Sequence, residues 1–240
     1  MAVIPYKEST ESKKVQVEAM FDNISGKYDF LNHFLSFSLD KYWRRKAIGL
    51  LKNDPPGELL DVATGTGDMV KTALRLSPSK ITGIDLSEGM LQVARKKKYP
   101  SAAKTLVEFV KGDSENLPFP DESYDAATVA FGVRNFENPA QGLSEMIRVL
   151  RPGGKLVVLE FSKPTVFPFA WIYRFYFRYV LPVFGRVLSK DKSAYTYLPV
   201  SVNLFPEGEK FVDLMKEAGC RECVFRPLTF GVVTLYSGIK

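Results

Sequence analysis

The stretch that decides the fold is Asp61-Val62-Ala63-Thr64-Gly65-Thr66-Gly67-Asp68. It follows an apolar run and precedes an amphipathic segment, which predicts a tight turn from a buried strand into a helix. Two glycines let the backbone of this turn approach a ligand closely, because glycine carries no Cβ atom. A small-molecule site is therefore expected here, although a glycine turn of this kind is also compatible with a purely structural role.

This turn departs from the fingerprint of dinucleotide-binding proteins. The third glycine of G-x-G-x-x-G is absent, and Val70 stands in its place. Asp68 stabilises the start of a helix as a cap or first-turn acid, but it would repel a pyrophosphate bound there. S-adenosylmethionine has no phosphate and carries an ammonium group, so a nearby acid suits it. The sequence favours S-adenosylmethionine over NAD.

Short apolar runs and amphipathic segments alternate around this turn. Strands are expected at residues 58–63, 80–84, 106–111, 124–130 and 155–160, with helices at 69–76, 89–98 and 140–150. Strands that alternate with helices form βαβ units and a parallel sheet. A helix at 207–218 and two closing strands at 222–227 and 231–237 complete the pattern. The prediction is an α/β fold with a mostly parallel, seven-stranded sheet and helices on both faces.

Further helices are expected outside this core. Residues 13–24 and 40–51 have helical patterns, and an aromatic-rich stretch at 28–37 lies between them. Residues 166–188 are apolar and aromatic, but Arg174, Arg178 and Arg186 interrupt them. Each arginine near the centre of a membrane span costs about 2.5–3.5 kcal/mol, so a span is not expected. An interfacial helix or a channel for a prenyl tail fits better, and a core helix or a dimer surface stays open.

Length and composition set the frame for these elements. The chain has 240 residues, of which 45% are hydrophobic and 25% charged, as in globular proteins with a sizeable core. One domain is expected over 1–240. It comprises a flexible tail (1–12), an N-terminal helical lid (13–53), a cofactor-binding core (54–163), an insertion facing substrate or membrane (164–205), and a C-terminal helix with strands (206–240).

The net charge and the cysteine content give less information about function than the motifs do. The net charge of +6 is compatible with a nucleic acid, an anionic membrane surface or no specific partner. Two cysteines suit a reducing compartment, and Cys220 and Cys223 enter a strand, where side chains three apart point to opposite faces. No apolar signal segment opens the chain, so a cytoplasmic location is expected.

Acidic residues also follow the second and third expected strands. Asp85 lies about 20 residues beyond the glycines, where an acid accepts hydrogen bonds from ribose hydroxyls. Asp113 follows the third strand, where a side chain meets the adenine edge. A single Asp after a strand is usually a turn former, but here three consecutive strands each end in one. This pattern supports a nucleoside site at the carboxyl edge of the sheet.

Five further segments of the chain belong together: MFDNISGKYD (20–29), LPFPD (117–121), FGVRN (131–135), LEFSKP (159–164) and DKSAYTYL (191–198). In these segments the sequence resembles the UbiE/MenG family, the C-methyltransferases of menaquinone and ubiquinone synthesis. The resemblance runs from about residue 15 to the C-terminus and implies a Rossmann-like class I methyltransferase fold that uses S-adenosylmethionine. It implies that Thr66, Asp85, Asp113 and Ser114 contact the cofactor, and Asp61, Gly65 and Gly67 of the glycine turn complete the predicted cofactor site.

Two positions depart from the family pattern. Asp40 stands where the family usually has a His before the segment Trp43-Arg44-Arg45, which leaves the role of this position open. Phe205-Pro206 stands where ubiquinone-type members tend to have His-Pro. The second departure and residues 228–232 (LTFGV) look more like the menaquinone-only branch. The expected reaction converts demethylmenaquinol to menaquinol. The methoxy-benzoquinol precursor of ubiquinone, another small-molecule or lipid acceptor, and a non-catalytic RNA-binding protein are the alternatives.

Catalytic residues are expected just after the fourth strand. A ring carbon of a quinol becomes a good nucleophile when a neighbouring hydroxyl loses its proton, so catalysis needs positioning and support of a phenolate. The arginine fork suits an oxygen anion. We expect Arg134 to support the phenolate and Asn135 to hold it or the ring oxygen. A buried pair of Arg134 with Glu137 or Glu160 is the structural alternative.

Two further side chains and the partners complete the expectations. Tyr28 is expected either to bond a substrate oxygen or to pack, and His33, the only histidine, to be a surface or capping residue. The partners expected are a polyprenyl quinol and, peripherally, the inner face of the cytoplasmic membrane. No metal and no nucleic acid are expected, and a homodimer is left open.

Overall fold

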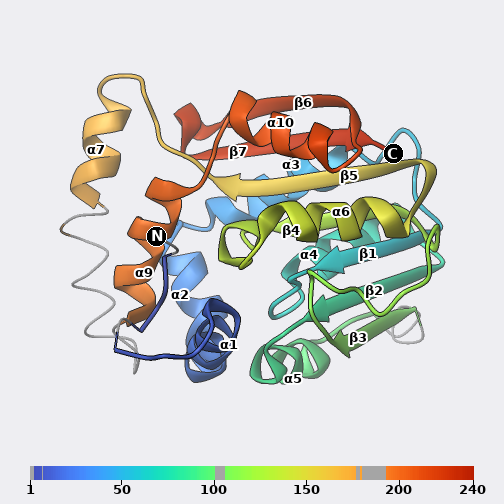
Figure 1. Cartoon of the computed structure of the whole chain (residues 1–240), viewed down its shortest axis with the longest axis horizontal. Coiled ribbons are helices and arrows are strands. Elements are labelled where there is room, and N and C mark those ends of the chain that lie inside the picture. The colour runs from blue at the N-terminus through green and yellow to red at the C-terminus, as the bar shows by residue number, and fades with distance from the viewer. Residues whose placement is uncertain (1–2, 7, 101–105, 177–178, 180–192) are drawn as a thin grey trace.

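Seven strands form one sheet in the computed structural model, which describes residues 3–6, 8–100, 106–176, 179 and 193–240 (Figure 1). The strand order is β3-β2-β1-β4-β5-β7-β6. Neighbours from β3 to β5 are parallel, whereas β7 is antiparallel to both β5 and β6. The expected mostly parallel sheet is confirmed. The strands are β1 (Glu58–Val62), β2 (Lys80–Asp85), β3 (Val107–Lys111), β4 (Tyr124–Ala130), β5 (Leu150–Phe161), β6 (Arg221–Leu228) and β7 (Val233–Ile239).

Helices cover both faces of this sheet (Figure 1). α3 (Leu39–Gly49) and α4 (Asp68–Ala73) lie on one face, and α6 (Pro139–Val149) and α10 (Glu209–Glu217) lie on the other. α5 (Glu88–Lys96) packs beside β3. The central strands are buried on both faces because adjacent side chains point to opposite sides: Leu59 packs with α3 and α4, and Leu60 packs with α6 and α10.

The remaining helices gather at the carboxyl edge of the parallel strands. In Figure 1 the arrowheads of β1, β2 and β5 point toward the side that carries α1 (Lys13–Ile24), α2 (Tyr28–Leu35) and α9 (Ser193–Leu204). α7 (Phe169–Phe175) follows β5 on the same side. Ligands of open α/β sheets bind outside this edge, so these helices lie where they can cover a bound ligand.

Two helices were not expected from the sequence. The aromatic-rich stretch forms α2, whose only buried residue is Leu31. α9 contains Pro199 in its interior, and an interior proline normally ends a helix because it removes a hydrogen bond and clashes with the preceding turn. Both segments are stabilised by tertiary packing at the edge of the sheet, which a local pattern does not reveal.

Other element bounds differ from expectation by a few residues, and two differences are larger. β5 begins at Leu150 rather than at residue 155, because Leu150 pairs with Tyr124 before a register shift. Within residues 166–188, α7 covers only 169–175, and Arg178 and Arg186 lie outside the described residues. No helix in the described part of the chain is long and apolar enough to cross a membrane.

Candidate functional site

The two glycines of the turn after β1 have different tasks. Both have a positive φ, +55° at Gly65 and +79° at Gly67, a region that side-chain-bearing residues adopt at a cost. A Cβ at Gly67 would lie 2.8 Å from the hydroxyl of Tyr99 and 3.1 Å from the ring of Phe109. A Cβ at Gly65 would meet no atom within 4 Å. Gly67 is therefore required by packing, while Gly65 faces the open space in which a ligand can approach the backbone.

Asp85, at the end of β2, holds this turn in place. Its Oδ2 accepts a hydrogen bond of 2.7 Å from the amide of Gly65, and its Oδ1 accepts one of 2.9 Å from the amide of Ser87. Burial raises the pKa of Asp85 to about 6, although these two amides act in the opposite direction. A carboxylate with two lone pairs still available, beside an open glycine, is suited to accept ribose hydroxyls.

Asp61 lies near the end of β1, in register with Gly83 of β2. Its Oδ1 accepts a hydrogen bond of 2.7 Å from Thr128, and its Oδ2 accepts one of 2.6 Å from Thr64. Burial raises the pKa of Asp61 to about 6. The raised pKa means that burial disfavours the ionised carboxylate. A positive group beside Asp61 would stabilise this ionised form.

Three cavities meet at the carboxyl edge of the sheet, and Tyr28 of α2 lines all of them. The first, which we call the nucleoside cavity, is bordered by Asp85, Met90 and Ser114. The second, the polar cavity, is bordered by Asp61, Arg44 and the glycine turn. The third, the apolar cavity, has a volume of about 400 Å³. Gly65 and Ala63 border both the nucleoside and the polar cavity, so one elongated ligand can pass from one to the other over Gly65.

The expected cofactor fits this arrangement. A ribose and a base suit the nucleoside cavity, which offers the Asp85 carboxylate and the apolar side chains of Ile84 and Met90. An amino-acid end suits the polar cavity, whose acids match its ammonium group. The junction at Tyr28 then lies beside the apolar cavity, where a methyl acceptor would bind.

The structure separates the predicted cofactor residues into two groups. Asp61, Gly65, Thr66, Asp85 and Ser114 line the nucleoside or the polar cavity. Gly67 and Asp113 do not.

Asp113 binds elsewhere. Its Oδ2 accepts a hydrogen bond of 2.6 Å from Lys14 Nζ of α1, and its Oδ1 accepts one from the amide of Glu115. Asp113 therefore joins α1 to the end of β3.

The catalytic candidates line the apolar cavity. Arg134 Nη1 donates to Glu160 Oε1 at 2.6 Å and to the carbonyl oxygen of Phe131 at 2.5 Å. The buried pair with Glu160, raised as an alternative, is thus present. Several buried polar atoms that border this cavity have no hydrogen-bond partner among the described residues, and they include Arg134 Nε, Asn135 Oδ1 and Tyr197 Oη. A buried polar group without a partner is costly, so this cavity offers a guanidinium donor, an amide acceptor and a phenol hydroxyl to a ligand.

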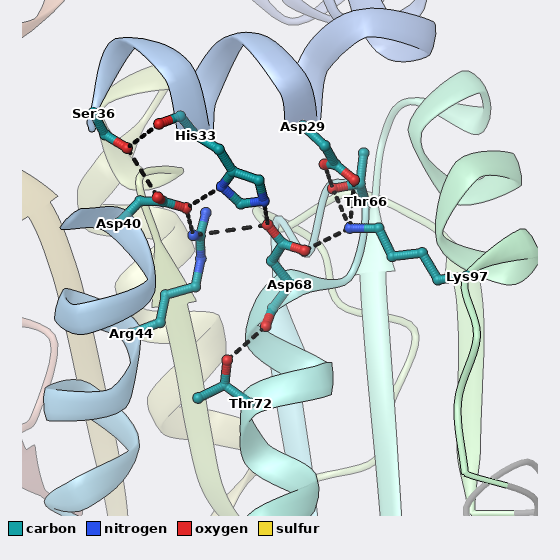
Figure 2. A network of polar contacts seen from close by, with 9 residues as sticks. All are labelled: Asp29, His33, Ser36, Asp40, Arg44, Thr66, Asp68, Thr72 and Lys97. Atoms are coloured by element: carbon teal, nitrogen blue, oxygen red, sulfur yellow. Dashed lines mark hydrogen bonds and ion pairs between the residues drawn. The ribbon is translucent and has the colours of Figure 1, made fainter. Parts of the chain in front are cut away.

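A network of ion pairs joins the N-terminal helices to the glycine turn (Figure 2). Lys97 Nζ, just after α5, lies 2.7 Å from Asp29 Oδ2 of α2 and 2.5 Å from Asp68 Oδ1 of α4. Thr66 Oγ1 donates a short hydrogen bond to Asp29. These contacts anchor α2 on the turn that borders the polar cavity.

His33 and Asp40 belong to the same network, and the sequence did not predict this. His33 Nδ1 lies 2.8 Å from Asp40 Oδ2, and its Nε2 lies 3.6 Å from Asp68 Oδ2 (Figure 2). Asp40 also accepts a short hydrogen bond from Arg44. Burial acts to raise the pKa of Asp40, but Arg44 and the hydrogen bond from Ser36 outweigh it, so the pKa lies below its usual range. His33 is half-buried in the last turn of α2, and its ring lies between these two carboxylates rather than pointing freely into solvent.

Ligand atoms of His33, Asp40 and Asp68 lie within 4.8 Å of one another, a spacing that a metal ion can use. Arg44 and Lys97 already contact two of these carboxylates, however. Cations of the protein itself compensate the charge of this cluster.

The two carboxyls with raised pKa values predict how cofactor binding depends on pH. An ammonium group beside Asp61 and ribose hydroxyls on Asp85 would favour the ionised forms of both carboxyls, so binding is expected to lower both pKa values and to release protons. Affinity for S-adenosylmethionine is therefore expected to fall as the pH drops from 7 to 5, through the values near 6. Calorimetry in buffers of different ionisation enthalpy should detect proton release at pH 6 and less at pH 7. An affinity that stays constant from pH 5 to 7 would contradict this assignment.

Comparison with known proteins identifies relatives along nearly the whole chain. The demethylmenaquinone methyltransferase of Bacteroides fragilis is 47% identical over 238 residues, which is 98% of this chain and 96% of the relative. The protein of the same name from Porphyromonas gingivalis is 45% identical, covering 99% of this chain and 98% of the relative. The ubiquinone/menaquinone biosynthesis C-methyltransferase UbiE of Geobacter sulfurreducens is 45% identical, covering 95% and 90%.

Solved structures support the fold. The crystal structure of a SAM-dependent methyltransferase from Thermotoga maritima has a TM-score of 0.63 at 24% identity, covering 92% of this chain and 99% of that one. The [4+2]-cyclase SpnF has a TM-score of 0.65 at 18% identity, covering 96% and 97%. These likenesses confirm the Rossmann-like methyltransferase fold.

A family model completes the comparison and confirms the resemblance seen in the sequence. The model of the ubiE/COQ5 methyltransferase family matches residues 8–240. With relatives at 45–47% identity, this match establishes that the chain belongs to the ubiE/COQ5 methyltransferase family and is an enzyme that uses S-adenosylmethionine.

Proposed function

We propose that the enzyme transfers a methyl group to a ring carbon of a polyprenyl quinol and converts demethylmenaquinol to menaquinol. The observation that carries this proposal is the apolar cavity next to the cofactor site. Its walls are mostly aromatic and aliphatic, and the unpartnered buried polar atoms that border it include Arg134 Nε, Asn135 Oδ1 and Tyr197 Oη. A large apolar ligand with a hydroxyl group matches such a site. Relatives that carry the name demethylmenaquinone methyltransferase support the same substrate.

Arg134 and Asn135 would position and activate the quinol. Asn135 Oδ1 can accept the hydrogen bond of a quinol hydroxyl, and Arg134 Nε can donate to the oxygen once its proton has left. The positive guanidinium favours the phenolate, which makes the neighbouring ring carbon nucleophilic. The bound cofactor supplies an electrophilic methyl group on its sulfonium sulfur. Glu160 holds the guanidinium plane in place through Nη1.

Tyr28 would set the distance between donor and acceptor. Tyr28 borders all three cavities, so it would contact the cofactor in the nucleoside and polar cavities and the quinol in the apolar cavity. Burial raises the pKa of Tyr28, so its hydroxyl stays protonated at neutral pH and can donate a hydrogen bond. Together with the rings of Phe131 and Phe161, it forms part of the apolar wall of this cavity.

A restoration experiment tests the substrate. The gene is expressed in a bacterial strain that makes both quinones but lacks its own quinone C-methyltransferase, and the extracted quinones are analysed by mass spectrometry. The proposal predicts that menaquinone replaces demethylmenaquinone. Restoration of ubiquinone alone, or of neither quinone, would contradict it.

We further propose that the apolar cavity receives its substrate from the membrane surface. Phe37, Ile172 and Phe230 border the cavity and are also exposed, so its rim is apolar where it meets the solvent. On α7 the side chains of Trp171 and Phe175 stack on each other, exposed by 60% and 48%. Aromatic residues of this kind suit the boundary between headgroups and acyl chains. These features support a position of the enzyme at the inner face of the cytoplasmic membrane, which holds the prenyl tail.

Replacement of Trp171 and Phe175 by serine is expected to raise the Michaelis constant for a long-tailed quinol presented in vesicles. A tail-less analogue should be nearly unaffected, because neither side chain borders the apolar cavity. Val224→Ser, on the exposed part of β6, is the matched control for loss of an apolar surface residue. Equal loss with both substrates, together with a lower melting temperature, would show that these residues serve only the packing of α7.

A further inference from the structure

The acidic residues of the polar cavity favour only one of the two charged groups at the amino-acid end of the cofactor. This end carries an ammonium group and a carboxylate. The cavity is bordered by two acids, Asp61 and Asp68. They favour the ammonium group, but they repel a carboxylate at the same distance. A positive side chain of the cavity is therefore needed to favour the carboxylate over this repulsion.

Arg44 of α3 is the only basic side chain among the described residues that border this cavity. It is buried, and its guanidinium lies over the ring of Phe131, 5.6 Å from the ring centre. Stacking on an aromatic face restricts the orientation of the guanidinium plane. The side chain is thus fixed before any ligand arrives.

Arg44 contacts its acidic neighbours through only one of its guanidinium nitrogens, Nη1. Nη1 donates to Asp40 and lies 3.7 Å from Asp68 Oδ2 (Figure 2). Within the described part of the chain, no hydrogen bond or ion pair involves its Nη2 or Nε. These two nitrogens form the edge that matches a carboxylate in a two-point contact. The buried guanidinium therefore retains donors that its acidic neighbours do not use.

We propose that Arg44 binds the α-carboxylate of S-adenosylmethionine through Nε and Nη2. Asp40 acts as a positioning residue, because it holds Nη1 and is itself held by Ser36 and His33. The ammonium group would then be free to face Asp61, which borders the same cavity. This inference goes beyond the proposed function and does not depend on which acceptor receives the methyl group.

A pair of ligands tests this contact by calorimetry. S-adenosylmethionine carries the carboxylate, and decarboxylated S-adenosylmethionine lacks it but keeps the sulfonium and ammonium groups. Arg44→Gln is expected to weaken binding of S-adenosylmethionine about 10- to 100-fold, the range for hydrogen bonds to a charged group. The affinity for the decarboxylated ligand should stay within about threefold or increase, because the variant no longer repels this more positive ligand.

Two further variants control for folding and for charge. Arg45→Gln removes the neighbouring arginine, which is exposed on the same helix, and should leave both affinities unchanged. Arg44→Lys keeps a positive charge beside Asp40 and Asp68, so it can test the contact if Arg44→Gln fails to fold. It should weaken the binding of S-adenosylmethionine alone, by a smaller factor than Arg44→Gln does. Equal losses with both ligands, or no loss with either, would overturn the proposal. So would unchanged cofactor binding accompanied by a higher Michaelis constant for the acceptor.

Discussion

Arg134→Lys is expected to lower the turnover number about a hundredfold while leaving the affinity for S-adenosylmethionine unchanged, because removal of one donor to a developing oxyanion typically has this effect. Lysine keeps the positive charge that Glu160 requires, and Glu160 is fully buried. It cannot reproduce a guanidinium that donates to Glu160 through Nη1 and to the substrate through Nε. Single-turnover kinetics with a reduced quinone analogue measures the effect on the chemical step.

The fold must remain intact for this result to be informative. Removal of one partner from a buried ion pair leaves an uncompensated charge and typically costs about 3–5 kcal/mol, which is why lysine is preferred to alanine. Arg151→Lys is the matched control, since Arg151 makes ion pairs with Glu58 and Asp125 at the surface, away from the three cavities. Unchanged turnover in Arg134→Lys would exclude the role in phenolate support. A lower melting temperature as the sole effect would leave Arg134 as a structural partner of Glu160.

Asp85→Ala is expected to weaken binding of S-adenosylmethionine by about 1.5–3 kcal/mol, or roughly 10- to 150-fold. The substitution removes a carboxylate that faces the nucleoside cavity and also releases the amides of Gly65 and Ser87. The glycine turn then loses the contact that fixes its position beside β2. Calorimetry of the cofactor-free enzyme measures the change directly.

Asp113→Ala is the matched comparison for Asp85→Ala, and only the structure shows that the two positions differ. Both acids follow a strand, but Asp113 binds Lys14 rather than facing a cavity. This pair is partly exposed to solvent, and such pairs contribute about 1 kcal/mol or less, so a change in cofactor affinity below about fivefold is expected. Equal losses for the two variants would contradict the placement of Asp113 outside the cofactor site.

The sheet and the centre of the site were predictable because they follow from local rules. Apolar runs of strand length alternate with helical patterns, and this alternation fixes a parallel sheet. The rule that ligands bind at the carboxyl edge then places Asp61, Gly65 and Asp85 together, as the structure has them.

The rest of the site depends on contacts between segments that are far apart in the chain. Asp40 and His33 meet Asp68 only because α2 and α3 pack against the glycine turn. The departure of Asp40 from the family pattern was visible in the sequence, but nothing local indicated that His33 would lie beside it. Likewise, the sequence could not show that Asp113 turns toward Lys14 of α1 while Asp85 stays at the cavity.

The most direct test of the proposed function is to follow the methyl carbon itself. Purified enzyme is incubated with reduced demethylmenaquinone and S-adenosylmethionine labelled with ¹³C in the methyl group, and the extracted product is examined by nuclear magnetic resonance. We predict a labelled methyl group bonded to a ring carbon, formed with wild-type enzyme and about a hundredfold more slowly with Arg134→Lys. A label found on a quinol oxygen, or no transfer to the quinol under conditions in which the enzyme binds both ligands, would contradict it.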